Sequence, residues 1–230
     1  MKPDAVPMSR LFLCSNGPTS PALDRELRRL IGPKPEEGTC WYIPTAPIHD
    51  GMEGLPEQQV PTIRQQFGLK TVRSIDPERV TGDLLRNKVS ELAPRLIWAE
   101  MGNTYNLAHH LGESGGDELV RELVAGGALY VGASAGAIMA GRTVQMALWK
   151  NWDDQTCEGT VSKDWNDKEV ARGLDLAGGR SIFPHANGQY VKESWQQEQR
   201  RKHGHTDHEI IALADGEGFA IEGEAGRYVV

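Results

Sequence analysis

The stretch LYVGASAGAIMA, residues 129–140, joins an apolar run to a G-x-S-x-G motif and an alanine-rich segment. The apolar run predicts a strand and the alanine-rich segment predicts a helix, so Ser134 falls in the turn between them. Small neighbours are needed there, because larger ones would clash with the adjacent backbone. Unpaired N–H groups at the start of the helix favour developing negative charge. We therefore predict Ser134 as a nucleophile and the Ala135 N–H as an oxyanion donor, with a helix-capping serine as the alternative.

Short apolar runs alternate with amphipathic stretches on the N-terminal side of this motif. Strands are predicted at residues 11–14, 40–43, 69–75, 96–99 and 129–131, and helices at residues 23–31, 57–67, 80–92, 105–111 and 118–124. Strands that alternate with helices favour right-handed crossovers onto a mostly parallel sheet. The predicted fold class is therefore α/β.

The pattern changes after Gly141. Residues 142–178 carry three tryptophans, many charges and no clear period, which indicates an insertion or a lid-like segment. Beyond it we expect a strand at 181–183 and a helix at 190–203. Residues 209–214 and 218–222 should form an antiparallel hairpin around Asp215 and Gly216. Since no repeat or linker interrupts the chain, residues 1–230 are predicted to form a single domain.

Composition excludes several classes of protein. The chain has 230 residues, with 25 Lys and Arg against 32 Asp and Glu, so its net charge is −7. A chain with this net negative charge is not expected to bind nucleic acid or an anionic membrane through its surface charge. No apolar run reaches the roughly 18 residues of a membrane span, and the N-terminus lacks the apolar core of a secretory signal. Three cysteines without a C-x-x-C motif favour a reducing compartment, so we expect a soluble cytoplasmic protein.

A second turn follows another predicted strand. Residues 96–107 read LIWAEMGNTYNL, with Gly102 at the carboxyl end of the strand. Ligands of open α/β sheets bind outside the carboxyl ends of the strands, which would place this turn in the same crevice as Ser134. Gly102 is predicted as the second oxyanion donor, and Asn103 and Thr104 as substrate-binding residues. An ordinary turn with Thr104 as helix cap is the alternative.

A serine nucleophile needs a base and a carboxylate that orients it. Of the seven histidines, only His185 follows a strand-like apolar run, and it is the predicted base. The chain order Ser, Asp or Glu, His would place the acid between these two residues. Asp153 and Asp154 are the predicted candidates, with Glu158 in reserve, although acidic residues of an insertion are often simply solvated.

One histidine cluster, residues 203–208, has the composition of a metal site. It lies in a polar turn after a charged helix, so a solvated loop is the favoured interpretation. We expect no metal and no cofactor.

Taken together, Gly-Asn-Thr at 102–104, Gly-Ala-Ser-Ala-Gly-Ala at 132–137 and Pro-His at 184–185 resemble the peptidase E family of serine exopeptidases, which also contains the cyanophycinases. The resemblance implies a doubly wound fold similar to class I glutamine amidotransferases, with serine in place of cysteine. It also implies a cytoplasmic, metal-independent enzyme that releases N-terminal aspartate from Asp-X dipeptides. The same site roles follow from it: Ser134 as nucleophile, His185 as base, and Gly102 and Ala135 as oxyanion donors.

Two positions depart from the family pattern. Met101 replaces the first glycine of Gly-Gly-Asn-Thr, and Trp195 or Gln197 stands where peptidase E has an arginine that receives the aspartate side chain. Trp149 and Trp195 are predicted to bind substrate. The alternative is that the tryptophans of the insertion pack this segment onto the domain.

The open alternatives for the function are a carboxypeptidase-like or cyanophycinase-like peptidase, an α/β-hydrolase esterase, and a non-catalytic binding domain. The expected partner is a short peptide, and a homodimer is one expected assembly.

Overall fold

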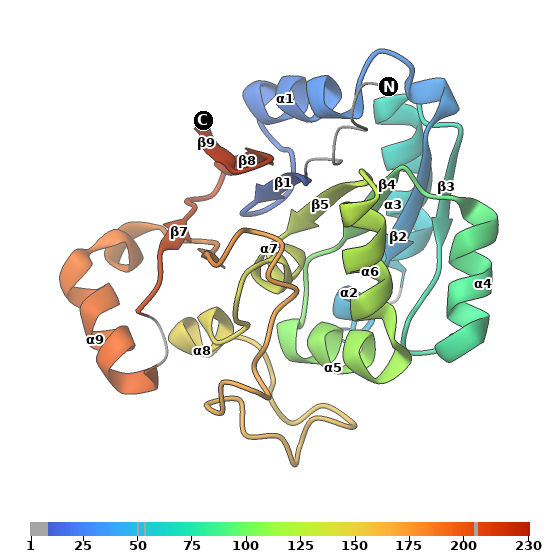
Figure 1. The fold of residues 1–230 in the computed structure, drawn as a ribbon. Coiled ribbons are helices and arrows are strands. Elements are labelled where there is room, and N and C mark those ends of the chain that lie inside the picture. Colours follow the sequence, from blue (N-terminus) through green and yellow to red (C-terminus); the bar gives the residue numbers. More distant parts are fainter. Residues whose placement is uncertain (1–8, 50, 53, 205–206) are drawn as a thin grey trace, which may run out of the picture.

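The computed structural model describes residues 9–49, 51–52, 54–204 and 207–230, and within them a central sheet of seven strands (Figure 1). Its strands are β1 (Arg10–Cys14), β2 (Thr39–Ile43), β3 (Thr71–Ser74), β4 (Leu96–Ala99), β5 (Leu129–Ala133), β8 (Gly218–Glu222) and β9 (Ala225–Val229). Their order is β3-β2-β4-β5-β1-β8-β9. The first five are parallel, whereas β8 and β9 form an antiparallel edge.

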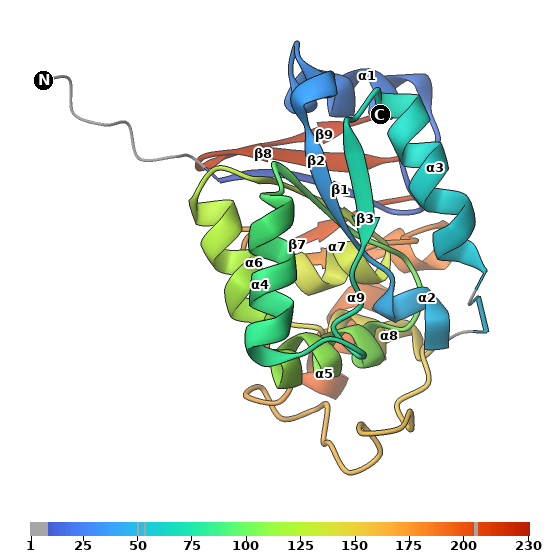
Figure 2. The same ribbon diagram turned by 90° about the vertical axis from the view of Figure 1, so that its right-hand side faces the viewer.

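Helices cover both faces of this sheet, as Figure 2 shows for α3 on one side and α4 and α6 on the other. The helices α1 (Pro21–Ile31) and α3 (Leu55–Phe67) share a core with Phe12 and Cys14. Leu11 and Leu13 belong to a second core, because successive side chains of a strand point to opposite faces. Helices of that second core include α4 (Gly82–Leu92), α5 (Thr104–Ser114), α6 (Gly116–Ala125) and α7 (Ala135–Ala140). The predicted α/β class with a doubly wound, mostly parallel sheet is confirmed.

The five strands and five helices predicted up to residue 131 are all present, with their ends displaced by a few residues. Helix α2 (Thr45–His49) was not predicted. It follows β2 directly and is only five residues long, too short for a helical period to show in the sequence.

The predicted C-terminal hairpin exists, but residues 209–214 do not belong to it. β7 (Ile210–Ala212) pairs in parallel with β6 (Ser181–Phe183), and the hairpin is formed by β8 and β9 instead. The helix α9 (Glu193–His203) runs between β6 and β7 as a crossover, which is what a parallel neighbour requires. Asp215 and Gly216 therefore lie in a connection between two sheets rather than at the tip of a hairpin.

Residues 142–178, predicted as an insertion, are largely irregular, and their outermost loop lies below α5 in Figure 1. Their helix is α8 (Met146–Lys150), and an isolated bridge joins Thr143 to Arg172. Trp165 is buried against the ring of Tyr105, with the ring centroids 4.8 Å apart. This tryptophan thus anchors the segment on α5, which is the packing role left open by the sequence.

In the described part of the chain, none of the helices combines the length and apolar character needed to cross a membrane.

Candidate active site

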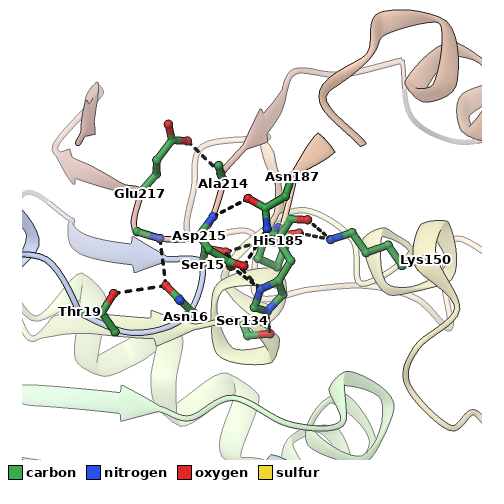
Figure 3. Close-up of polar contacts among 12 residues, drawn as sticks. Ser15, Asn16, Thr19, Ser134, Lys150, His185, Asn187, Ala214, Asp215 and Glu217 are labelled. Atoms are coloured by element: carbon green, nitrogen blue, oxygen red, sulfur yellow. Dashed lines mark hydrogen bonds and ion pairs between the residues drawn. The ribbon is translucent and has the colours of Figure 1, made fainter. Parts of the chain in front are cut away.

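The carboxyl ends of five strands carry the polar residues of one site. Ser15 follows β1, Gly102 follows β4, Ser134 follows β5, His185 follows β6, and Asp215 follows β7. Figure 3 shows the side chains of Ser15, Ser134, His185 and Asp215 directed toward one another. Ser15 and Asp215, which are 200 positions apart, meet there although β1 and β7 belong to different sheets.

Ser134 occupies a strained turn between β5 and α7. Its backbone has φ +47° and ψ −104°, a conformation that L residues rarely adopt and that clusters at functional sites. The turn also requires Gly136, because a Cβ there would lie 2.1 Å from the carbonyl oxygen of Ala99. Ser134 Oγ lies 2.9 Å from His185 Nε2. The predicted serine and histidine are thus brought into direct contact.

Gly136→Ala is expected to lower the free energy of unfolding by about 1–3 kcal/mol, because the added methyl group overlaps the β4 backbone. Gly112→Ala is the matched control. Gly112 is an exposed glycine within α5 with no atom near its hypothetical Cβ, so alanine should stabilise the fold by about 0.5–1 kcal/mol. Urea denaturation followed by circular dichroism measures both. Equal stability of the two variants would contradict the packing argument.

His185 is held at both its ring and its backbone. Its Nδ1 lies 2.6 Å from Asp215 Oδ1, and its backbone N–H donates to Ser15 Oγ at 2.8 Å. Like Ser134, it has a positive φ, +54°. Because Asp215 accepts a hydrogen bond from the Nδ1–H of His185, the imidazole presents Nε2 as the acceptor for the Ser134 hydroxyl.

Asp215 was missed in the sequence. Its Oδ1 accepts from Ser15 Oγ at 2.8 Å, its Oδ2 accepts from Asn187 Nδ2 at 2.7 Å, and its own N–H donates to Asn187 Oδ1 at 3.0 Å. Burial raises the pKa of Asp215, but hydrogen bonds from Ser15, His185 and Asn187 outweigh burial and hold it below its ordinary value. The carboxylate is therefore ionised and fixed in direction.

The acids proposed from the sequence lie elsewhere. Asp153 Oδ2 accepts from the Thr104 N–H at 2.8 Å, and Asp154 Oδ1 accepts from the Thr156 N–H at 2.8 Å. Glu158 is exposed. Since Ser134 and Asp215 take both ring nitrogens of His185, none of these three residues holds the position expected for the orienting acid. The misleading assumption was the chain order, because the acid follows the histidine here.

Burial raises the pKa of Asp153, partly offset by hydrogen bonds from Thr104 and by the charge of His185. Asp153 thus lies near the imidazole without taking a ring nitrogen. The Asp153 carboxyl group lies in the wall of the site, and a cationic partner would stabilise its ionised form.

The turn after β4 contains the second predicted oxyanion donor. Gly102 has φ +129°, and a Cβ there would lie 2.5 Å from the Ala46 carbonyl. Asn103 is fully buried and caps α5, accepting from the Asn106 N–H and donating to the Asp154 carbonyl, each at 2.9 Å. Asn103, rather than Thr104, is thus the helix cap, and it ties α5 to the insertion. Within the described chain, no acceptor is found for the N–H of Gly102 or of Ala135.

A small pocket of about 60 Å³ opens beside Ser134. Its polar walls are Thr104, Lys150, Asp153 and His185, and its apolar walls are Ile138, Met146, Ala147, Trp152, Phe183 and Pro184. A larger cleft of about 1320 Å³, which Arg142 and Asp175 help to line, includes neither Ser134 nor His185. Of these two cavities, the small pocket is therefore the one in which a bound molecule could contact Ser134 and His185.

The tryptophans predicted to bind substrate lie outside the walls of this pocket. Trp149 is only 4% exposed, and its ring centroid lies 5.2 Å from that of Phe183. Trp195 stacks on the same phenylalanine at 5.7 Å. Trp152 is instead the tryptophan in the pocket wall: it is 60% exposed, and its ring centroid lies 5.8 Å from that of His185.

Within the described residues, no group of three His, Cys, Asp or Glu side chains could hold a metal ion. Of the histidine cluster at 203–208, His205 and Thr206 lie outside the described residues. His208 Nε2 lies 2.6 Å from Ser181 Oγ at the start of β6.

Known proteins share this chain's sequence pattern and fold. The family model of Peptidase family S51 matches residues 11–229. An uncharacterized peptidase of Listeria monocytogenes serovar 1/2a is 28% identical over 137 residues, which is 57% of this chain and 60% of that relative's length.

Two solved structures share the fold. A candidate peptidase E protein from Listeria monocytogenes superposes with a TM-score of 0.66 at 21% identity, covering 96% of this chain and 98% of its own. A peptidase from an acI-B1 actinobacterium gives a TM-score of 0.64 at 18% identity, covering 96% of this chain and 87% of its own. At these identities the likeness concerns the fold alone.

Proposed function

Because the chain belongs to peptidase family S51, we propose that it is a serine exopeptidase that cleaves short peptides at the pocket beside Ser134. This membership confirms the family-level resemblance seen in the sequence. The observation that carries the proposal is the hydrogen-bonded path from Ser134 Oγ through both nitrogens of His185 to Asp215. A nucleophile in contact with a base that is oriented by a carboxylate is the arrangement that acyl transfer needs.

In the proposed mechanism, Ser134 Oγ attacks the carbonyl carbon of the scissile bond while His185 Nε2 takes the hydroxyl proton. The protonated imidazole then gives this proton to the leaving amine. Asp215 keeps the other ring proton on Nδ1 and stabilises the imidazolium. The N–H groups of Ala135 and Gly102 would hold the oxyanion, since each lies in the turn after a strand that borders the site. Water, activated by the same histidine, completes the cycle by hydrolysing the acyl-enzyme.

The preference for a free N-terminus is assigned to Asp153. Its carboxyl group lines the pocket with Ser134, and the Thr104 N–H fixes its direction. An α-ammonium group entering the pocket would stabilise the ionised form of this carboxyl group, whose pKa is raised by burial. Asp153 is thus proposed to bind substrate rather than to orient His185.

Asp153→Asn is expected to lower kcat/KM for dipeptides with a free N-terminus by about 10- to 100-fold, because a charge-assisted hydrogen bond is lost. The rate for the matching N-acetylated peptides should change less than about two-fold. Asp154→Asn is the control, since the Asp154 side chain caps Thr156 on the exposed side of the loop. If Asp153→Asn left the ratio of free to acetylated substrate unchanged, the assignment to the α-ammonium would be wrong.

The side-chain preference follows from the remaining walls of the pocket. Trp152, Ile138 and Met146 favour an apolar or aromatic substrate residue. Neither Trp195 nor Gln197, the two candidates for the position where peptidase E has an arginine, supplies a positive charge, and Gln197 donates to Glu193 at 3.0 Å. We therefore propose that the enzyme prefers an apolar substrate residue over aspartate. The preference for Asp-X dipeptides that the family resemblance implies is the alternative.

A library of di- and tripeptides with free and blocked termini tests the proposed function, together with fluorophosphonate labelling of Ser134. We expect labelling and cleavage of peptides with free N-termini. Cleavage of N-blocked peptides at a free C-terminus would favour the carboxypeptidase-like alternative, and cleavage of β-aspartyl-Arg the cyanophycinase-like one. Hydrolysis of p-nitrophenyl acetate alone would favour an esterase. No labelling and no hydrolysis would favour a binding domain. The cytoplasmic location, the homodimer and the lid-like role of residues 142–178 stay predictions.

A further inference from the structure

Lys150, the last residue of α8, has an unusual environment next to the proposed base. Its Nζ donates to the carbonyl oxygen of Pro184 at 3.0 Å and also to that of His185. Three aromatic rings surround the same ammonium group, with their centroids 4.3 Å away for Trp152, 4.5 Å for Tyr190 and 4.9 Å for Phe183. Figure 3 shows the side chain reaching toward His185 from the side opposite Ser15 and Asp215.

His185 depends on such support, because its φ of +54° is unfavourable for a residue with a side chain. Its N–H donates to Ser15 Oγ, and its carbonyl accepts from Lys150 Nζ. The same carbonyl also accepts from the Asn187 N–H at 2.8 Å. Two side chains from other parts of the fold, Ser15 just after β1 and Lys150 of α8, thus add to this local hydrogen bond in holding the backbone of the base. Since the backbone conformation sets the direction of Cβ, it also sets where the imidazole points.

We propose that Lys150 is a positioning residue, whose ammonium group holds the backbone at Pro184 and His185 in the strained conformation that aims Nε2 at Ser134. This inference rests on the proposed function for its kinetic readout. Lys150 has no part in the proton transfers, and two of its three N–H donors are used on the backbone. Its effect is therefore expected on kcat rather than on substrate binding.

The positive charge is needed for this role. Charge-assisted hydrogen bonds are about twice as strong as neutral ones, and the ring faces attract a cation but not a neutral amine. Burial among the rings lowers the pKa of Lys150 to about 8, against the opposing effect of the Asp215 carboxylate. His185, Tyr190 and Asp153 are the other titratable groups at this position. The lysine consequently loses its proton as pH rises through about 8, and kcat should fall in the same range. A general base that is already neutral would by itself give a constant kcat there.

Lys150→Met and Lys150→Arg test the proposal. Methionine keeps the apolar stem within the rings but donates nothing, and we expect kcat to fall by about 10- to 100-fold with KM changed less than about three-fold. Arginine stays protonated, so we expect it to recover part of kcat and to remove the fall in kcat above about pH 8. Lys192→Met, at an exposed lysine before α9, is the control and should change neither quantity.

A second readout does not depend on peptide hydrolysis. The proton shared between His185 Nδ1 and Asp215 should give a downfield NMR resonance, assigned by its loss in Asp215→Asn. We expect Lys150→Met to broaden or shift it and Lys150→Arg to restore it. If Lys150→Met changed neither the resonance nor kcat, the proposal would be overturned. A fall in kcat above about pH 8 that persists in Lys150→Arg would also overturn it. A raised KM at constant kcat would assign Lys150 to substrate binding instead. Should the wild type cleave no peptide, the proposed function fails, while the resonance still decides the role of Lys150.

Discussion

Ser134→Ala is expected to lower kcat for peptide hydrolysis by about 10⁴- to 10⁶-fold, because the atom that forms the acyl-enzyme is removed. The 2.9 Å contact between Ser134 Oγ and His185 Nε2 is the geometric reason for expecting so large an effect. KM should change little, since the pocket walls stay in place. Initial rates on dipeptides with a free N-terminus measure the loss, and labelling by a fluorophosphonate should disappear with it.

Ser194→Ala serves as the control for Ser134→Ala, because Ser194 is an exposed serine near the start of α9. It should retain the wild-type rate. Thermal unfolding of both variants checks that any loss is not one of folding. A Ser134→Ala protein that is folded and still cleaves peptides at more than about 1% of the wild-type rate would rule out the acyl-enzyme mechanism.

Asp215→Asn is expected to have the second-largest effect, a fall in kcat of about 10³- to 10⁴-fold. The amide can donate to Nδ1, which favours the tautomer with the proton on Nε2, and that nitrogen then cannot accept the Ser134 proton. The variant also lacks the negative charge that stabilises the imidazolium. Ser15 and Asn187 still bond to the side chain, so the fold should tolerate the change.

Asp153→Asn is the matched comparison, since it makes the same chemical change at one of the two acids that the sequence favoured. Its effect should be on the discrimination between free and blocked N-termini, with kcat on the blocked peptides retained. Comparable losses of kcat on both classes of peptide in Asp153→Asn, with a near-normal Asp215→Asn, would reverse the two assignments.

The lowered pKa of Asp215 has a consequence for stability. A carboxyl group with a folded pKa below its unfolded value contributes stability that is present above the unfolded pKa, about 3.9, and is lost as pH falls through the folded one. Asp215 contributes in that sense, so Asp215→Asn should narrow the difference in stability between neutral pH and pH 3. The contribution is modest, because the side chain is 43% exposed.

The order of strands and helices along the chain could be predicted because it is written in local patterns. Apolar runs of three or four residues marked β1, β2, β4 and β5, and the helical period marked α1 and α4. Ser134 and His185 were predicted for the same reason, since each follows an apolar run at the end of a strand. Trp149 and Trp195 lie outside the pocket walls, whereas Trp152 lies in them, because nothing in the local sequence distinguishes a tryptophan that packs on the core from one that borders a pocket.

The amino-acid sequence by itself determined the α/β class and the family, and it predicted Ser134 and His185, which the fold brings into contact. The tertiary structure alone decided that Asp215 faces His185 and that Lys150 binds its backbone. Asp215 lies 30 residues from the histidine, and the contact exists because β6 and β7 pair in parallel, so that their carboxyl ends meet. Which strands pair depends on long-range burial and backbone hydrogen bonding, whereas a motif such as G-x-S-x-G records only what its own turn requires.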